Sequence, residues 1–209
     1  LFRSLSTLAK GLELLGRTAF AVVTQHKGLT ASFDEATSAM ADDLVKTEAA
    51  IAAKDRMAKS AADAAAKVSK RQYDLVVITD FGHGTMSESL IKTVTKEARF
   101  LAVNTQTNST NYGFNLITRY PRADYIVLDE LEARLAVHDR DSDIEDVILK
   151  LGYKRICVTQ GANGAVGFDG EFYREKAVAR KVVDTMGAGD AFLAVSSPFA
   201  ACGDRKSTR

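Results

Sequence analysis

Seven residues near the end of the chain, Asp184–Asp190 (DTMGAGD), have the composition of a turn that binds phosphate. The two glycines of this run let the backbone pass close to a ligand without obstruction by side chains. If a helix begins there, its first N–H groups and its dipole form a site for an anion, such as a transferring phosphoryl group. Asp190 stands beside that site and could accept a proton from an attacking hydroxyl group. The purely structural alternative is a tight turn from a strand into a helix, capped by aspartate.

Polar residues and glycines also follow the apolar runs that the sequence predicts as strands. Four of these runs are Leu75–Thr79, Phe100–Val103, Tyr125–Leu128 and Arg155–Thr159. The polar positions at or just after their ends are Asp80, Asn104, Asp129, Glu132, Thr159 and the loop Gly161–Gly164. In an open parallel sheet, ligands bind beyond the carboxyl ends of the strands. The sequence therefore predicts one candidate site along one edge of a sheet.

Amphipathic segments of helical length separate the predicted strands. They are Ser87–Ala98, Tyr112–Tyr120, Glu130–Val137 and Ser142–Leu151. Apolar strands that alternate with such helices predict parallel βαβ units in a sheet covered on both faces. The chain then continues with two close strands joined by an Asp-Gly turn typical of a hairpin, and with one more strand: Ala165–Phe168, Glu171–Arg174 and Ala179–Val183. The predicted fold class is α/β.

The first third of the chain departs from this pattern. Thr18–Thr24 is a short β-branched run that predicts one strand. Ala31–Ser69 contains 14 alanines and acidic–basic pairs four residues apart, which favour a helix. Its apolar stripe is thin, so we interpret this helix as a solvated excursion, with a partner-binding segment as the alternative. We divide the chain into a divergent N-terminal segment 1–72, a core 73–203 and a tail 204–209.

Three motifs of the chain resemble those of the ribokinase-like (PfkB) carbohydrate kinases and occur in the family's order. Asp184–Asp190 resembles the C-terminal signature of the family, and Val158–Gly164 (VTQGANG) resembles its nucleotide loop. Asp129–Glu132 (DELE) falls where these kinases carry an Asn-x-x-Glu element, with aspartate in place of asparagine. The resemblance covers roughly Tyr73–Ala201. It implies a ribokinase-like three-layer αβα core with a mostly parallel sheet.

The resemblance also implies a role for each matching residue. Asp190 would be the base that activates the substrate hydroxyl group, and Glu132 would organise Mg²⁺ near the phosphates. Backbone N–H groups of the same turn would form the anion hole: Gly187, Ala188, Gly189 and Asp190. The residues implied in binding ATP and its phosphates are Thr159, Gly161, Asn163, Gly164, Asp184 and Asp129. ATP and Mg²⁺ are therefore the expected cofactors.

Within this family, Asp80–Gly84 (DFGHG) resembles the Asp-Tyr-Gly-Lys-Gly element of heptose-phosphate kinases, the kinase halves of ADP-heptose synthases. His83 stands where these kinases have a lysine, and Asn104-Thr105-Gln106 stands where they have Asp-Pro-Lys. The resemblance implies transfer of the γ-phosphoryl group of ATP to a hydroxyl group of a sugar or sugar phosphate, in the synthesis of heptose or lipopolysaccharide precursors. Because a lysine is lost, an unphosphorylated or differently decorated sugar is an open alternative. A non-catalytic or truncated nucleotide-binding α/β module is the alternative function.

The composition of the chain limits which binding partners and which cellular compartment we expect. Lys and Arg number 28 against 27 Asp and Glu, a net charge of +1 that predicts no nucleic-acid or anionic-membrane partner. Two cysteines cannot form a disulfide framework, so we expect a reducing, cytoplasmic setting. Nothing before Tyr73 matches the sugar-binding lid of the family, and the chain ends soon after Asp190. We therefore expect a kinase core truncated at both ends, and a homodimer only in the full-length protein.

Overall fold

The described strands of the computed structural model form one seven-stranded sheet, in which neighbouring strands follow the order of the chain. The structure describes residues 21–23, 56, 59–70, 73–109, 111–177 and 187–203. The strands are β1 (Ala21–Val23), β2 (Val76–Asp80), β3 (Leu101–Thr105), β4 (Tyr125–Asp129), β5 (Ile156–Thr159), β6 (Ala165–Phe168) and β7 (Phe172–Glu175). β1 to β5 run parallel, and β6 and β7 add an antiparallel hairpin at one edge. This confirms the predicted α/β class and its mostly parallel sheet.

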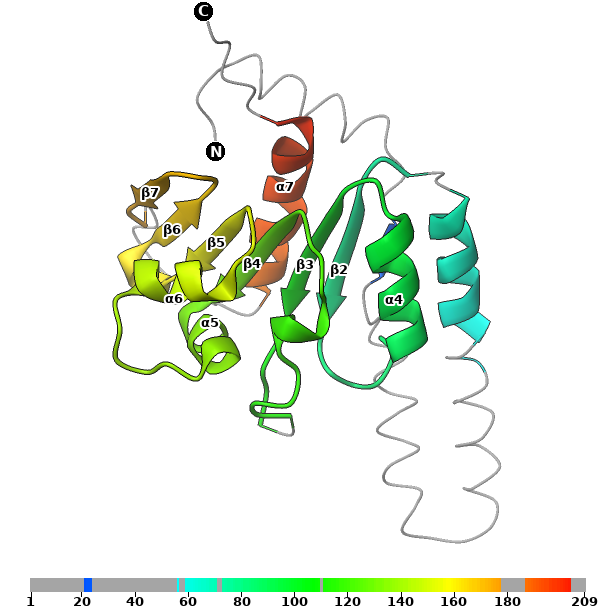
Figure 1. Cartoon of the computed structure of the whole chain (residues 1–209), viewed down its shortest axis with the longest axis horizontal. Helices are drawn as coiled ribbons and strands as arrows, with labels where there is room; N and C mark the ends of the chain where they lie inside the picture. The colour runs from blue at the N-terminus through cyan, green and yellow to red at the C-terminus, as the bar shows by residue number, and fades with distance from the viewer. Residues whose placement is uncertain are drawn as a thin grey trace, which may run out of the picture.

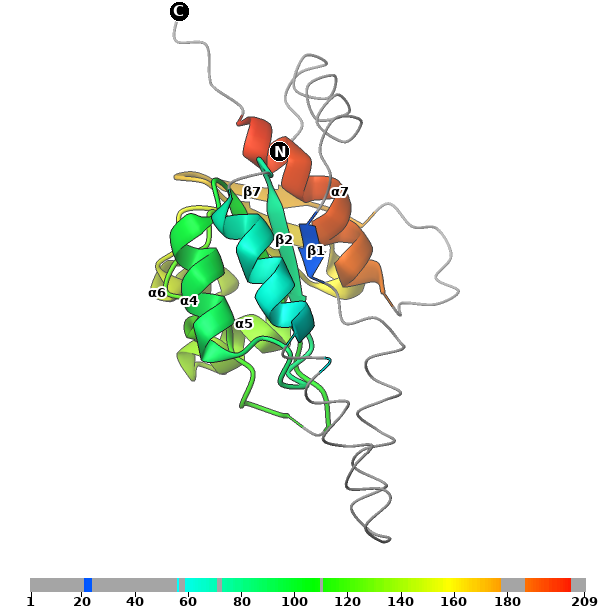
Figure 2. The same cartoon turned by 90° about the vertical axis from the view of Figure 1, so that its right-hand side faces the viewer.

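Helices cover both faces of the sheet (Figure 1, Figure 2). On one face lie α4 (Glu88–Glu97), α5 (Glu130–Val137), α6 (Ile144–Leu151) and the helical residues 59–69; on the other lies α7 (Ala188–Cys202). Two short 3₁₀ helices, η1 (Ile117–Arg119) and η2 (Gly161–Asn163), occur in the loops. These three layers confirm the predicted three-layer αβα core.

Side chains of the central strands alternate between two cores, one under each helical layer. In β2, Val76 and Ile78 pack in the core under α4, whereas Val77 packs in the core that includes Leu193 of α7. Every residue of β2 and β3 is buried, as expected of parallel strands that helices cover on both sides. By the same alternation, the side chain of Asp80 at the end of β2 lies on the α4 side of the sheet.

The segment Tyr112–Tyr120, predicted as a helix, is instead a turn-rich loop that ends in η1. Gly113 has a positive φ of 77° in this loop. Just before it, the side chains of Asn108 and Asn111 each accept a hydrogen bond from the backbone N–H of the other, at 3.1 and 2.8 Å. Asparagine side chains that bind nearby backbone groups compete with helix formation. The helix prediction is therefore wrong for a local reason.

Parts of the N-terminal segment join the core. β1, within the predicted strand Thr18–Thr24, pairs with β2, and the side chain of Val68 is buried in the core under α4. Of the predicted helix Ala31–Ser69, residues 56 and 59–69 are described and are helical. The rest of that helix, the predicted strand Ala179–Val183 and the tail 204–209 lie outside the described residues. The division of the chain at residue 72 stays a prediction.

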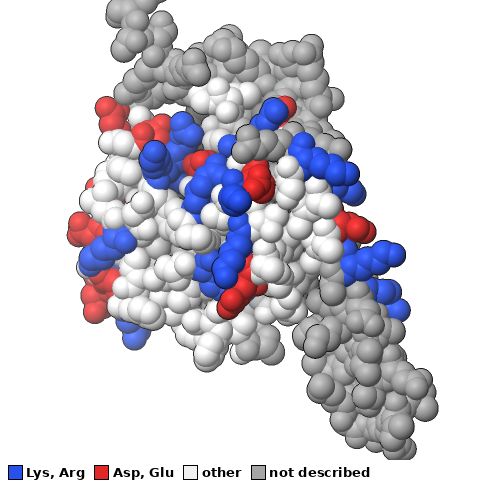
Figure 3. Space-filling model, turned by 45° about the vertical axis from the view of Figure 1, so that its right-hand side comes forward, with Lys and Arg blue, Asp and Glu red and all other residues white. Residues whose placement is uncertain are grey.

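Charged side chains of both signs are mixed on the surface. Lys and Arg gather in the middle of one face, with Asp and Glu beside them (Figure 3). Near the amino ends of the strands, Arg99 pairs with Asp74 at 2.6 Å and Arg122 pairs with Asp124 at 2.5 Å. Within the described part of the chain, we find no helix whose length and apolarity would suffice to cross a membrane.

Candidate active site

Helix α7 runs antiparallel to the strands and begins at their carboxyl edge. Near its start, the side chain of Gln106, just after β3, donates a hydrogen bond from Nε2 to Oδ1 of Asp190 at 3.0 Å. Further along, the hydroxyl group of Tyr125 at the start of β4 donates to Oγ of Ser196 at 3.0 Å. Figure 1 shows the same direction, with the orange start of α7 towards the arrowheads of the strands. The first turn of α7 therefore lies at the edge where parallel sheets bind ligands.

The first turn of α7 has no side-chain cap from its own N-cap position, because the residue there is a glycine. Its N-cap residue is Gly187, whose φ of 76° lies in the left-handed region that favours glycine. The N–H groups of Ala188, Gly189 and Asp190 have no acceptor within the helix, as at the start of any α-helix. A Cβ added at Gly189 would meet no atom of the described residues within 4 Å, so none of them blocks the space beside this turn. The turn has the geometry of an anion site, and the anion hole assigned to it stays a prediction.

Asp190 is half-buried beside this turn. Burial raises the pKa of its carboxyl group above the ordinary value, and the hydrogen bond from Gln106 partly opposes that rise. A carboxylate with a raised pKa is a stronger proton acceptor when it is ionised. Position and proton affinity are both compatible with the role of base predicted for Asp190.

Asp129 and Glu132 form a capping box at the start of α5. Oδ1 of Asp129 accepts a hydrogen bond from the N–H of Glu132 at 2.7 Å, and Oε2 of Glu132 accepts one from the N–H of Asp129 at 2.9 Å. Oε1 of Glu132 also accepts from the N–H of Thr107 at 3.1 Å, which ties α5 to the loop after β3. Burial first, and the charge of Asp129 second, raise the pKa of Glu132 to about 7.

This raised pKa predicts that the stability of the chain depends on pH. Because the pKa of Glu132 rises from 4.5 to about 7 on folding, its contribution to stability is complete below pH 4.5 and is lost as the pH rises through about 7. We expect this loss to amount to about 3 kcal/mol of unfolding free energy between pH 4.5 and 8. Urea unfolding across this range, in EDTA, measures it. In Asp129→Asn the loss should be smaller, whereas identical pH curves for wild type and Glu132→Gln would contradict the assignment.

The predicted nucleotide loop follows β5. Thr159, the last residue of β5, lies in register with Asp129 of β4. The exposed helix η2 comes next and contains Gly161 and Asn163. Gln160 lies between Thr159 and η2. It donates a hydrogen bond from Nε2 to Oε2 of Glu130 at 2.8 Å and so ties the loop to α5. The nucleotide loop and the capping box are therefore neighbours at the same edge of the sheet.

Gly164 closes this loop at a position where the fold requires glycine. Its φ is 98°, and a Cβ there would lie 1.9 Å from the carbonyl oxygen of Glu175 in β7. A side chain would therefore clash with backbone and strain the turn. This structural reason for glycine holds whether or not the loop binds a nucleotide.

Asp80 is a fully buried carboxylate at the carboxyl end of β2. Oδ1 accepts a hydrogen bond from the N–H of Gly82 at 2.9 Å. Oδ2 accepts one from Nη1 of Arg119 at 3.2 Å and one from the hydroxyl group of Tyr120 at 2.9 Å. Burial first, and the charge of Asp80 second, raise the pKa of Tyr120, so its hydroxyl group remains a donor. Both carboxylate oxygens of Asp80 thus accept hydrogen bonds within the fold, and these bonds link the loop after β2 to η1 and the residue that follows it.

Backbone and asparagine side chains fasten the loop after β3 to the end of β2. The N–H of Gln106 donates to the carbonyl oxygen of Asp80 at 2.8 Å. Nδ2 of Asn115 donates to the same oxygen at 2.7 Å, and Nδ2 of Asn111 donates to the carbonyl oxygen of Phe81 at 2.8 Å. These bonds hold Gln106 next to Asp190.

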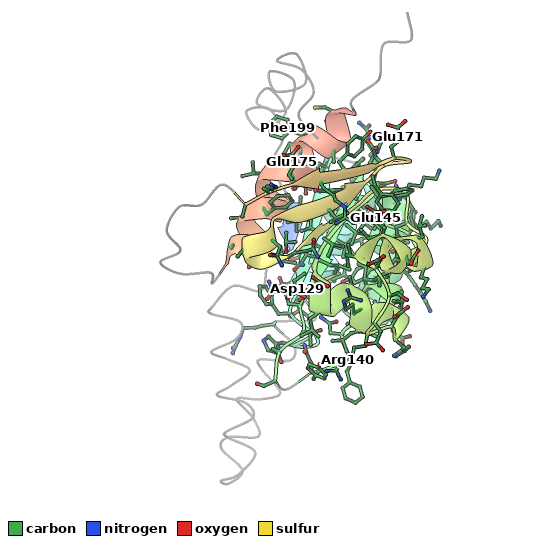
Figure 4. The ribbon with its side chains drawn as sticks, turned by 90° about the vertical axis from the view of Figure 1, so that its left-hand side faces the viewer. Asp129, Arg140, Glu145, Glu171, Glu175 and Phe199 are labelled. Carbon is green, nitrogen blue, oxygen red and sulfur yellow. The ribbon has the colours of Figure 1, made fainter. Side chains whose placement is uncertain are left out.

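The structure places most of the predicted site residues along one edge of the sheet. Asp129 lies at this carboxyl edge, away from Glu171 at the tip of the β6–β7 hairpin (Figure 4). Asp184 lies outside the described residues. Gln106 and Thr107, whose bonds reach Asp190 and Glu132, carried no predicted role. The available signal was their place just after a predicted strand, at the same edge as the motifs.

The donor groups of this edge suit a magnesium ion that phosphate and water help to bind. Among the described residues, no group of three or more His, Cys, Asp or Glu side chains could hold a metal ion. Mg²⁺ bound with a phosphate substrate needs only one or two carboxylates, because waters and phosphate oxygens complete its shell. Asp129 is exposed, and its capping bond occupies only Oδ1. Its second carboxylate oxygen is therefore available to such an ion, with Glu132 holding Asp129 in place.

Comparison with known proteins gives one family and one curated relative. Residues 17–197 match the family described as pfkB family carbohydrate kinase. Bifunctional protein HldE of Hyphomonas neptunium is 33% identical to the chain over 128 residues, which cover 57% of the chain and 26% of that protein. The chain therefore spans about a quarter of the length of this relative.

Three solved structures share the fold. A phosphofructokinase-2 mutant from Escherichia coli matches with a TM-score of 0.54 and 16% identity, over 68% of this chain and 50% of that chain. The pyridoxal kinase from Staphylococcus aureus in complex with AMP-PCP and pyridoxal matches with a TM-score of 0.52 and 18% identity, over 68% of this chain and 59% of that chain. Arabidopsis thaliana ribokinase complexed with ribose and ATP matches with a TM-score of 0.50 and 20% identity, over 65% of this chain and 46% of that chain. The chain spans about half of each. At these identities the likeness shows the fold alone, but the sequence match extends over most of the chain. The chain belongs to the pfkB family of carbohydrate kinases.

Proposed function

We propose that the chain transfers the γ-phosphoryl group of ATP to a sugar hydroxyl group, with Mg²⁺ as cofactor. The observation that carries the proposal is the position of Asp190 in the first turn of α7, whose N-cap residue is a glycine, at the carboxyl edge of the sheet. A proton acceptor and a set of free N–H groups are thus adjacent, as phosphoryl transfer to a hydroxyl group requires. Arabidopsis ribokinase, which shares the fold, was solved with ribose and ATP.

In this proposal each group acts on one part of the reaction. Asp190 accepts the proton of the sugar hydroxyl group as its oxygen attacks. The N–H groups of Gly187 to Asp190 donate hydrogen bonds to the transferring phosphoryl group. Asp184 is assigned to the phosphate shell from the family motif alone. The residues that line the nucleotide are Thr159, Gly161, Asn163 and Gly164.

Magnesium is required at this edge because carboxylates alone repel phosphate. Asp129 is exposed, stands where the family carries an asparagine, and lies in register with Thr159 at the start of the predicted nucleotide loop. Mg²⁺ bound there supplies charge neutralisation to the phosphate oxygens. Glu132 orients Asp129 through the capping box and thereby organises the metal.

The acceptor that we favour is an unphosphorylated sugar, with a heptose phosphate as the alternative in the synthesis of lipopolysaccharide precursors. In the described loops at the carboxyl edge, Arg119 carries a guanidinium group, and this group already donates hydrogen bonds within the fold. Nη1 of Arg119 donates to Asp80 and to Asn115 at 3.2 and 2.6 Å, and Nη2 donates to the carbonyl oxygen of Met86 at 2.9 Å. The guanidinium group of Arg119 is therefore not free to pair with a phosphate on the sugar.

The compartment and the assembly are proposed from sequence and family. The chain has only two cysteines, too few for a disulfide framework, which suits a reducing cytoplasm. We propose no nucleic-acid or membrane partner, because the net charge of +1 offers no attraction to polyanions. A homodimer is proposed for the full-length protein only.

Release of ADP tests the proposed function. The 209-residue chain is incubated with ATP, Mg²⁺ and a panel of unphosphorylated hexoses and heptoses and of heptose phosphates. We expect ADP release that depends on the sugar and stops in EDTA, with the unphosphorylated sugars preferred. Thermal stabilisation by ATP without ADP release from any sugar would instead favour a non-catalytic nucleotide-binding module.

A further inference from the structure

Two consecutive residues after β3 contact the two carboxylates that the proposed function uses most. The Gln106 side chain donates from Nε2 to Oδ1 of Asp190 at 3.0 Å. The backbone N–H of Thr107 donates to Oε1 of Glu132 at 3.1 Å. These bonds join groups that lie 84 and 25 residues apart in the sequence. The base and the carboxylate on the metal side are thus attached to one dipeptide.

This dipeptide is itself held firmly. The N–H of Gln106 donates to the carbonyl oxygen of Asp80 at 2.8 Å, and the carbonyl oxygen of Gln106 accepts from Nδ2 of Asn115 at 3.3 Å. Asn115 in turn accepts from Arg119 at 2.6 Å, and Arg119 pairs with the buried Asp80. A chain of hydrogen bonds therefore leads from the buried end of β2 to the side chain of Asp190.

We infer that Gln106 is a positioning residue, which holds the carboxylate of Asp190 in the orientation that accepts the substrate proton. The inference rests on the proposed function. A carboxylate can rotate about its Cα–Cβ and Cβ–Cγ bonds, and the Gln106 amide fixes Oδ1 by a directional bond. Oδ2 then remains for the sugar hydroxyl group. Misplacement of a reacting group by about 1 Å can cost up to about 100-fold in rate, so loss of this bond should appear in kcat.

The substitutions separate positioning from stability. Gln106→Ala removes the donor, and Gln106→Glu keeps the shape of the side chain but places an acceptor against Asp190. We expect kcat to fall about tenfold in Gln106→Ala and further in Gln106→Glu, with the KM values for ATP and sugar within about twofold of wild type. Tyr153→Phe is the matched control, because the Tyr153 hydroxyl group bonds the carbonyl oxygens of Ile117 and Tyr120 on the same loop and touches neither carboxylate. It should lower the melting temperature and leave kcat unchanged.

A double-mutant cycle tests whether Gln106 acts through Asp190. In an Asp190→Ala background, Gln106→Ala should lower the residual kcat no further, because the group that Gln106 positions is absent. An equal fall of kcat in both backgrounds, or an unchanged kcat in Gln106→Ala alone, would overturn the inference.

A spectroscopic measurement keeps this test separate from the test of the proposed function. In ¹⁵N NMR spectra of the whole chain, the side-chain amide signals of Gln106 should shift in Asp190→Ala and stay in place in Asp129→Asn. If the wild-type chain releases no ADP, the proposed function fails, and these shifts alone then decide whether Gln106 holds Asp190. Signals that do not move in Asp190→Ala overturn the inference even in an active kinase.

Discussion

Asp190→Asn is expected to lower kcat for phosphoryl transfer by about 10³-fold, within the range that a positioned general base contributes. Asparagine keeps the size of the side chain and its bond to Gln106, but its amide cannot take the proton of the sugar hydroxyl group. The KM values for ATP and sugar should change little, because the N–H groups of the α7 turn and the nucleotide loop are untouched. ADP release at saturating ATP and sugar measures the effect.

The control for this prediction is Asp169→Asn, which removes a carboxylate of the same kind from the exposed turn of the β6–β7 hairpin. It should retain wild-type kcat. Stabilisation by ATP in a thermal melt should be equal in wild type and Asp190→Asn, which shows that the variant is folded and binds nucleotide. An Asp190→Asn chain as active as wild type would remove the assigned mechanism.

Local chemistry explains which parts of the fold could be predicted from the sequence. The strands are continuous apolar runs, so β2 to β5 appear within one or two residues of the predicted bounds. Helix α5 has the predicted bounds, and its start could be predicted because the capping residues Asp129 and Glu132 lie three positions apart in the sequence. Signals of this kind need no knowledge of the rest of the chain.

The loop after β3 depends on partners far away in the sequence. Its asparagines have the spacing of a helix but bind the carbonyl oxygens of Asp80 and Phe81, 27 to 35 residues earlier. A pattern read in a short window cannot reveal such partners. The same limit applies to the candidate site, where the bond between Gln106 and Asp190 spans 84 residues. The motifs could be found from sequence, whereas the group that positions the base could not.

A resemblance to a family also leaves the reason for a residue open. Gly164 was assigned to the nucleotide site because it matches a loop motif, yet the carbonyl oxygen of Glu175 already excludes a side chain there. Asp80 was expected at the ligand edge, and it is at that edge, but it bonds Gly82, Arg119 and Tyr120 within the fold. Both residues support the shape of the site whatever ligand binds.

Arg119→Met should destabilise the chain by about 3 to 5 kcal/mol of unfolding free energy. The Asp80 side chain is 0% exposed, and Arg119 is its cationic partner. Methionine keeps most of the length of the arginine stem but removes the charge, so the buried Asp80 side chain would lose its cationic partner and keep only neutral donors. The substitution also removes the hydrogen bonds that Arg119 donates to Oδ1 of Asn115 and to the carbonyl oxygen of Met86. Urea unfolding at pH 7 measures the change.

Two comparisons identify the uncompensated charge as the cause. Arg99→Met removes a pair of the same kind, with Asp74 at 2.6 Å, but both side chains are more than half exposed, so we expect a loss of no more than about 1 kcal/mol. The double variant Asp80→Asn, Arg119→Met removes the buried charge together with its partner. It should be more stable than Arg119→Met alone, because an amide without a cation costs less to bury than a carboxylate without one. If the double variant is instead the less stable of the two, Arg119 stabilises this edge by packing rather than by charge.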